Sequence, residues 1–217
     1  MQKLRYDAAV FDMDGLLLDT ERIVNQAWDE AAKRTGFADV AHAKRSCLGL
    51  NEASTRQFFL ETYGAEFDYD TFRTLTRKLA HEVLDVHVPV KTGAKAFLAA
   101  LREKGIPCAV ASSTREATVR DQLDRAGLLC YFDAVITGDM VTKGKPDPEI
   151  YLKAAAALNV TPASCLAFED SLNGLCSAHA AGMHTVHIPD QVPADERTAA
   201  VAELCYDSLL QAMEELI

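Results

Sequence analysis

Short apolar segments alternate with helical stretches over most of this chain, and this alternation restricts the possible folds more than any other feature. Length and apolar composition predict strands that are buried on both faces. They are residues 6–11, 106–112, 133–138, 165–168 and 184–188. The helices predicted between them, each followed by glycine or asparagine, are residues 94–104, 116–126 and 149–158. The pattern predicts a doubly wound, Rossmann-like α/β fold with a parallel sheet.

Residues 19–87 interrupt this alternation. They predict helices only, over residues 21–35, 52–62 and 70–84, with no strand between them. A chain of 217 residues is long enough for one sizeable core and a smaller appendage. We therefore expect an α/β core formed by residues 1–18 and 88–217, with residues 19–87 inserted as a small helical domain.

Two carboxylates, Asp12 and Asp14, follow the first predicted strand and precede Gly15. Residues i and i+2 of an extended chain point to the same side, so the two carboxylates should converge. Like charges this close are costly unless a cation or a proton compensates them. The pair indicates a divalent-metal site or an acid/base couple, and its alternative interpretation is a charged turn before a helix.

Other polar residues follow the later predicted strands. Ser112 ends the second one, Lys145 lies in a Gly-Lys-Pro-Asp-Pro segment, and Glu169 and Asp170 follow the strand at 165–168. Ligands of open α/β sheets bind at the carboxyl ends of the strands, so we expect these side chains in one crevice. Pro146 after the lysine excludes a nucleotide-binding P-loop, which continues with serine or threonine.

In this order, the segments resemble the four motifs of the haloacid-dehalogenase-like phosphohydrolases, and the branch with β-phosphoglucomutase and small sugar-phosphate phosphatases is the most similar. The resemblance covers nearly the whole chain and identifies the helical insert with the cap that closes over the active site in that family. It implies that Asp12 is the nucleophile, which forms an aspartyl phosphate, and that Asp14 is the general acid and base. Ser112 and Lys145 would bind the phosphoryl oxygens.

The same resemblance implies Mg²⁺ as the cofactor. Its protein ligands would be Asp12, Asp170 and the main-chain oxygen of Asp14, with Glu169 supporting them. These are hard oxygen donors, which suit Mg²⁺ because water and phosphate complete its coordination shell.

Position by position, the insert differs from that of the mutase. The places where β-phosphoglucomutase carries cationic side chains hold Val24, Glu52 and Leu79, although Lys78 or Arg56 could supply a charge. We therefore predict hydrolysis of small phosphomonoesters, such as a sugar phosphate or a related metabolite. The alternatives are a β-phosphoglucomutase-type phosphosugar mutase and, less well supported, a non-catalytic phospho-accepting or regulatory module.

Specificity for the leaving group is expected from side chains near the mouth of the cap, namely Arg22, Asn51 and Glu52. Arg115, shortly after Ser112, has two interpretations. Either it contacts the substrate phosphate or it begins a helix.

Composition and charge restrict the partners and the compartment. The net charge is −10 and no long basic run is present, which argues against binding nucleic acid. No apolar run approaches the roughly 20 residues that span a bilayer, and no signal peptide is apparent, so we expect no membrane association and a cytoplasmic protein. The 6 scattered cysteines predict reduced thiols. The sequence leaves the oligomeric state open.

Overall fold

A parallel sheet is the central layer of the computed structural model, which describes residues 5–48 and 50–217. In these residues the sheet has six strands in the order β3-β2-β1-β4-β5-β6. The strands are β1 (Ala8–Phe11), β2 (Cys108–Ser112), β3 (Ala134–Thr137), β4 (Cys165–Glu169), β5 (His184–His187) and β6 (Leu204–Cys205). The first predicted active-site strand, β1, therefore lies in the interior of the sheet, between β2 and β4.

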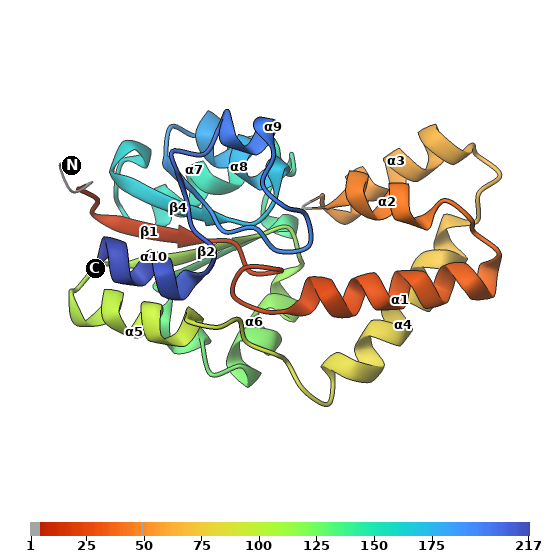
Figure 1. The fold of residues 1–217 in the computed structure, drawn as a ribbon, viewed down its shortest axis with the longest axis horizontal. Coiled ribbons are helices and arrows are strands. Elements are labelled where there is room, and N and C mark those ends of the chain that lie inside the picture. Colours follow the sequence, from red (N-terminus) through yellow and green to blue (C-terminus); the bar gives the residue numbers. More distant parts are fainter. Residues whose placement is uncertain (1–4, 49) are drawn as a thin grey trace.

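Alternate residues of β1 pack into separate hydrophobic clusters on the two faces of the sheet. Ala9 and Phe11 belong to one cluster, while Ala8 and Val10 belong to the other. Helices cover both faces, with α5 (Ala94–Glu103), α6 (Glu116–Arg125) and α10 (Leu209–Leu216) on the first and α7 (Glu149–Ala157) and α8 (Leu172–Ala180) on the second. Figure 1 shows α5 and α10 below the sheet and α7 and α8 above it. We call β1–β6 with α5–α10 the sheet unit, which also includes α9 (Glu196–Ala199).

Four helices, here called the helical unit, lie beyond the end of the sheet toward which β1 points (Figure 1). They are α1 (Thr20–Thr35), α2 (Val40–Cys47), α3 (Glu52–Tyr63) and α4 (Tyr69–Leu84). Their own apolar core is aromatic. The buried ring of Phe59 lies 5.6 Å from the rings of Trp28 and Phe72, centroid to centroid. Among the described residues from 20 to 84 there is no strand.

Two chain segments connect the units and run side by side. Asp19 N donates to Pro89 O at 2.9 Å, and Lys91 N donates to Leu17 O at 2.9 Å. Between these hydrogen bonds, Leu18 forms an isolated antiparallel bridge with Val90. We call residues 17–19 and 89–91 the connecting ribbon.

The predicted fold class is confirmed, and every predicted strand and helix has a counterpart. The structure adds β6 at one edge of the sheet and the helices α2, α9 and α10, none of which was predicted. Residues 1–4 lie outside the described residues. They belong to the expected core range, and the expectation of no signal peptide depends on them. In the part that the structure does describe, none of the helices is both long and apolar enough to cross a bilayer.

Candidate active site

A cleft of about 210 Å³ opens at the carboxyl ends of the strands, between the two units. Asp12, Asp14 and Asp170 line it from the sheet unit. Val24 and Trp28 of α1 line it from the helical unit. The structure thus brings the predicted catalytic carboxylates together in the cleft between the sheet unit and the helical unit.

At the base of the cleft, a buried ammonium group joins two buried carboxylates. Lys145 Nζ donates to Asp12 Oδ1 at 2.6 Å and to Glu169 Oε1 at 2.5 Å, and the Lys145 side chain is only 1% exposed. Tyr151 Oη donates to the same Glu169 oxygen at 2.5 Å, and Ser171 Oγ donates to Glu169 Oε2 at 3.2 Å. A buried lysine is favourable only when paired, and here the pairing fixes the position of Asp12.

Burial and crowding of charge set the proton affinities in this network. Desolvation raises the pKa of Asp12 to about 8 even though Lys145 opposes the shift, and the charges of Glu169 and Asp14 add to it. For Lys145 itself, burial disfavours the ammonium, but the attraction of Asp12 and Glu169 outweighs it and raises the pKa. Burial followed by the charge of Asp12 raises the pKa of Asp170 well above its ordinary value. Without a further cation, the site therefore favours protonated carboxyl groups.

Hydroxyl groups orient the second carboxylate of the motif. Thr20 Oγ1 donates to Asp14 Oδ1 at 2.6 Å, and Thr114 Oγ1 donates to Asp14 Oδ2 at 2.9 Å. Ser112 Oγ, at the end of β2, lies 3.4 Å from the same Oδ2. Since Thr20 begins α1, one of these contacts reaches the first turn of the helical unit.

A group of buried carboxylates fits a divalent cation. One oxygen from each of Asp12, Glu169 and Asp170 lies within 4.8 Å of the others. Lys145 neutralises part of this charge through the first two, while Asp170 Oδ2 is buried and lacks a hydrogen-bond partner among the described residues. An orphaned carboxylate oxygen beside two others is the donor set that a hard cation such as Mg²⁺ requires.

Two glycines leave the room that these carboxylates occupy. The φ angle of Gly15 is +85°, and a Cβ on this residue would lie 2.4 Å from Asp170 Oδ2, which is closer than van der Waals contact allows. A Cβ on Gly174 would lie 1.9 Å from the carboxylate of Glu169. The glycines of the first and fourth motifs therefore keep space for the acidic cluster.

The residues expected to set specificity lie in different places. Asn51 accepts a hydrogen bond from Ser54 N at 2.9 Å, capping α3, and its side chain lies against Gly144 of the sheet unit. Glu52 contacts Arg115 across the two units, with Oε2 3.3 Å from Nη2. Arg22 instead pairs with Asp19 at 2.8 Å and is exposed outside the cleft at Asp12.

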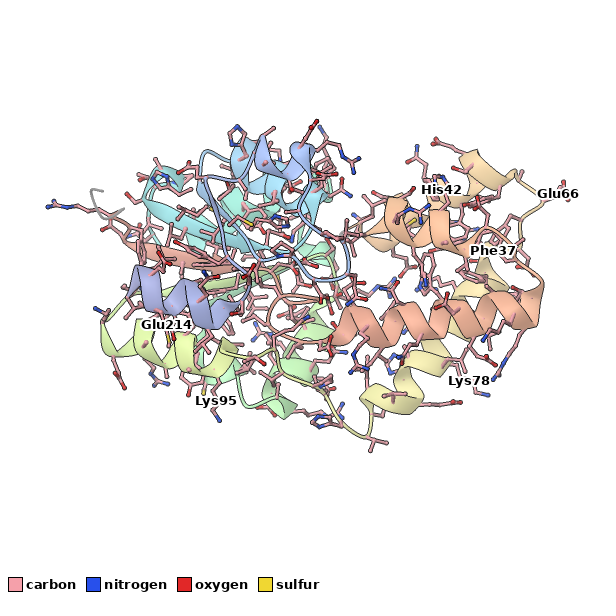
Figure 2. All side chains as sticks on the ribbon, in the orientation of Figure 1. Phe37, His42, Glu66, Lys78, Lys95 and Glu214 are labelled. Atoms are coloured by element: carbon pink, nitrogen blue, oxygen red, sulfur yellow. The ribbon has the colours of Figure 1, made fainter. Side chains whose placement is uncertain are left out.

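The residues proposed as alternative sources of charge also lie away from that cleft. Arg56 forms a two-pronged ion pair with Asp70 on the surface of the helical unit. Lys78 is exposed on α4, on the side away from the sheet unit in Figure 2. Leu79 packs with the apolar clusters of the helical unit, whereas Val24 does line the cleft.

Sequence reasoning missed several side chains of the site. Thr20 and Thr114 each lie within a few residues of a recognised motif, so a search for hydroxyl groups near the motifs would have found them. Tyr151 lies six residues after Lys145, and nothing in its local sequence signals its contact with Glu169. Glu21 faces the acidic cluster from α1, and burial followed by the charges of Asp14 and Asp12 raises its pKa to about 8.

Comparisons with known proteins agree with this geometry. The sequence model of the haloacid dehalogenase-like hydrolases matches residues 9–188. The phosphorylated carbohydrates phosphatase of Thermotoga maritima is 30% identical over 215 residues, which cover 97% of this chain and 100% of that protein. The fructose-1-phosphate phosphatase YqaB of Escherichia coli is 32% identical over 190 residues, covering 85% of this chain and 97% of that protein. The solved β-phosphoglucomutase of Clostridium difficile has a similar fold, with a TM-score of 0.80 at 23% identity over 95% of this chain and 92% of that chain.

Proposed function

Because this chain belongs to the haloacid dehalogenase-like hydrolases and is a phosphoric monoester hydrolase, we propose that it is a Mg²⁺-dependent phosphatase acting through an aspartyl phosphate. Its substrate would be a small phosphorylated metabolite, such as a sugar phosphate. The observation that carries the proposal is the Asp12–Lys145–Glu169 network beside the unpartnered oxygen of Asp170.

Asp12 is placed for nucleophilic attack. Lys145 holds its Oδ1, and among the described residues its Oδ2 has no hydrogen-bond partner. We assign to Oδ2 the in-line attack on phosphorus, in which the new P–O bond forms as the bond to the alcohol breaks. Water then cleaves the aspartyl phosphate, releasing inorganic phosphate and restoring the carboxylate.

Asp14 serves both steps as the proton carrier. Held by Thr20 and Thr114, it would donate a proton to the departing alkoxide and then accept one from the attacking water. Ser112 and the ammonium of Lys145 would bind the phosphoryl oxygens, where fixed donors stabilise the charge that develops in the transition state.

Mg²⁺ would be held by Asp12, Asp170 and the main-chain oxygen of Asp14, with Glu169 supporting this set. When bound, it supplies positive charge that offsets the repulsion between the carboxylates and the incoming phosphate. We further propose that residues 19–87 form the cap domain of the family, that residues 1–18 and 88–217 form the core, and that Asn51, Glu52 and Arg115 contribute to specificity at their interface.

The phosphatase proposal is tested by a screen of the purified protein with Mg²⁺ against sugar, polyol and nucleoside monophosphates, scored by released phosphate. We expect turnover of at least one small ester, and its loss in excess EDTA and in Asp12→Asn. In Asp14→Asn, transfer to Asp12 should persist with an activated leaving group while release of phosphate slows. Activity that is undiminished by EDTA or by Asp12→Asn would overturn the proposal.

The mutase alternative has a separate readout. With β-glucose 1-phosphate and a trace of the 1,6-bisphosphate, a phosphatase yields free phosphate and little glucose 6-phosphate. Formation of glucose 6-phosphate faster than phosphate would assign the chain to the mutases instead. Absence of all turnover would favour the non-catalytic module.

A further inference from the structure

The active-site cleft continues past Asp14 into a second arm, which follows α4. This α4 arm, about 330 Å³, shares Asp14, Thr20 and Thr114 with the cleft at Asp12. Its far part is cationic, lined by Arg73 and Arg77 of α4 and by Arg115 before α6. In a chain of net charge −10, three arginines along one arm of a cleft form a local positive site.

One carboxylate of the chain itself occupies this positive site. Glu52 Oε2 lies 2.5 Å from Arg73 Nη2 and 3.3 Å from Arg115 Nη2, so a single oxygen accepts hydrogen bonds from two guanidinium groups. Glu52 begins α3, and its two partners belong to different units. Arg77, which lies one helical turn beyond Arg73, is exposed to solvent and has no ion-pair partner among the described residues.

We propose that Glu52 determines specificity by discriminating against substrates whose leaving group carries a second anionic group. A second anion that entered the α4 arm would have to lie beside the Glu52 carboxylate or displace it from Arg73 and Arg115. Like charges at contact distance cost enough, even in a wet cleft, to lower the rate on the order of tenfold. A neutral polyol leaving group meets no such repulsion. This inference rests on the proposed phosphatase function and narrows its substrate class to phosphomonoesters of neutral alcohols.

The experiment compares two esters that differ at one end only. Glycerol 3-phosphate ends in a neutral hydroxymethyl group, and 3-phosphoglycerate ends in a carboxylate. For the wild type, we expect a higher kcat/KM with glycerol 3-phosphate. In Glu52→Gln, which keeps the shape of the side chain and removes its charge, the ratio should shift toward 3-phosphoglycerate by roughly tenfold. The shift should shrink at high salt because the arm is open to solvent.

Two further variants separate this role from a structural one. Asp70→Asn removes the same charge from an ion pair between α3 and α4 that does not line the α4 arm, and it should leave the ratio unchanged. Glu52→Gln combined with Arg73→Gln should lose most of the gain, because the cation that attracts the second anion is gone. An unchanged ratio in Glu52→Gln, or an equal shift in Asp70→Asn, would overturn the proposal.

A binding measurement distinguishes failure of this inference from failure of the phosphatase proposal. Asp12→Asn is expected to bind both esters without turning them over, so calorimetric titration reports affinity alone. Adding Glu52→Gln in that background should strengthen binding of 3-phosphoglycerate relative to glycerol 3-phosphate. If the wild type hydrolyses neither ester, the same titration still tests the role of Glu52. An unchanged ratio of the two affinities on adding Glu52→Gln, or no binding of either ester, would count against that role.

Discussion

The buried ion pairs of Lys145 in the sheet unit and the exposed ion pair of Arg56 in the helical unit differ in what the loss of one partner does. Lys145 is 1% exposed and joins carboxylates from two strand ends. The pair of Arg56 and Asp70, in the helical unit, has side chains 46% and 67% exposed. A buried charge that loses its partner cannot recruit water, whereas an exposed one can. The ion pairs of Lys145 therefore contribute both to stability and to the chemistry of the site, whereas the pair of Arg56 and Asp70 contributes little to the free energy of unfolding.

The largest effect expected from this difference is that of Lys145→Met. The substitution leaves Asp12 and Glu169 buried without their shared cation, and breaking such a pair costs about 3–5 kcal/mol. We expect the free energy of unfolding, measured by urea denaturation, to fall by that amount and phosphatase activity to disappear.

Lys33→Met is the matched control for this prediction. The Lys33 side chain is 76% exposed and 4.0 Å from Glu30, so its loss should change stability by less than about 0.5 kcal/mol. Equal losses in the two variants would refute the contrast between buried and exposed pairs.

Gly174→Ala tests whether space beside Glu169 matters more than helix propensity. Alanine in place of glycine inside a helix ordinarily stabilises by about 1 kcal/mol. Here the new Cβ would lie 1.9 Å from the carboxylate, and overpacking of this kind costs about 1–3 kcal/mol. We expect net destabilisation in a denaturant titration and weaker Mg²⁺ binding by calorimetry. A gain in stability would show that Glu169 moves aside freely.

The pH dependence of stability in EDTA tests the crowding of carboxylates. The pKa values of Asp12 and Glu21 are raised to about 8 from 3.8 and 4.5, so the folded protein holds protons that the unfolded chain has lost. Stability of the metal-free protein should then fall as pH rises from about 4 to about 8. Mg²⁺ binds the deprotonated groups and should flatten this slope. Melting temperatures across that range, with EDTA and with Mg²⁺, provide the measurement, and parallel curves would contradict the prediction.

The smallest effect is expected from Asp70→Asn. It removes one partner of an ion pair that is exposed on both sides, and such pairs contribute about 0–1 kcal/mol. Urea denaturation should place the variant within about 1 kcal/mol of the wild type. A larger loss would mean that the helical unit depends on its surface charges.

The sequence allowed the architecture to be predicted because period and composition report burial on both faces. Residues 8–11 and 165–168 are apolar throughout, and a motif carboxylate follows each run. The two residues of β6 are too few to show a period, and α2 has only two buried residues in its 8 positions. Edge strands and short surface helices depend on tertiary packing more than on local pattern.

The site was predictable to the extent that its residues lie within motifs. Asp12 and Lys145 are 133 positions apart, and only the resemblance and the rule that ligands bind at the carboxyl ends of parallel strands placed them together. The assignment of Val24, Glu52 and Leu79 considered positions one at a time and did not reveal that Arg73, from the next helix, reaches Glu52. Contacts between helices that are distant in sequence depend on crossing angles and rotamers, which periodicity does not specify.

The connecting ribbon has a consequence for how a protein of this kind diversifies. One of its two segments enters the helical unit and the other leaves it, and the two are hydrogen-bonded to each other. The two ends of the helical unit are therefore adjacent where they join the sheet unit. Inserts are tolerated where their ends are close together and exposed. The segment between Thr20 and Pro89 can thus be exchanged for another insert, longer or shorter, while Thr20 keeps its hydrogen bond to Asp14. The residues that recognise the alcohol and those that transfer the phosphoryl group can then evolve independently of each other.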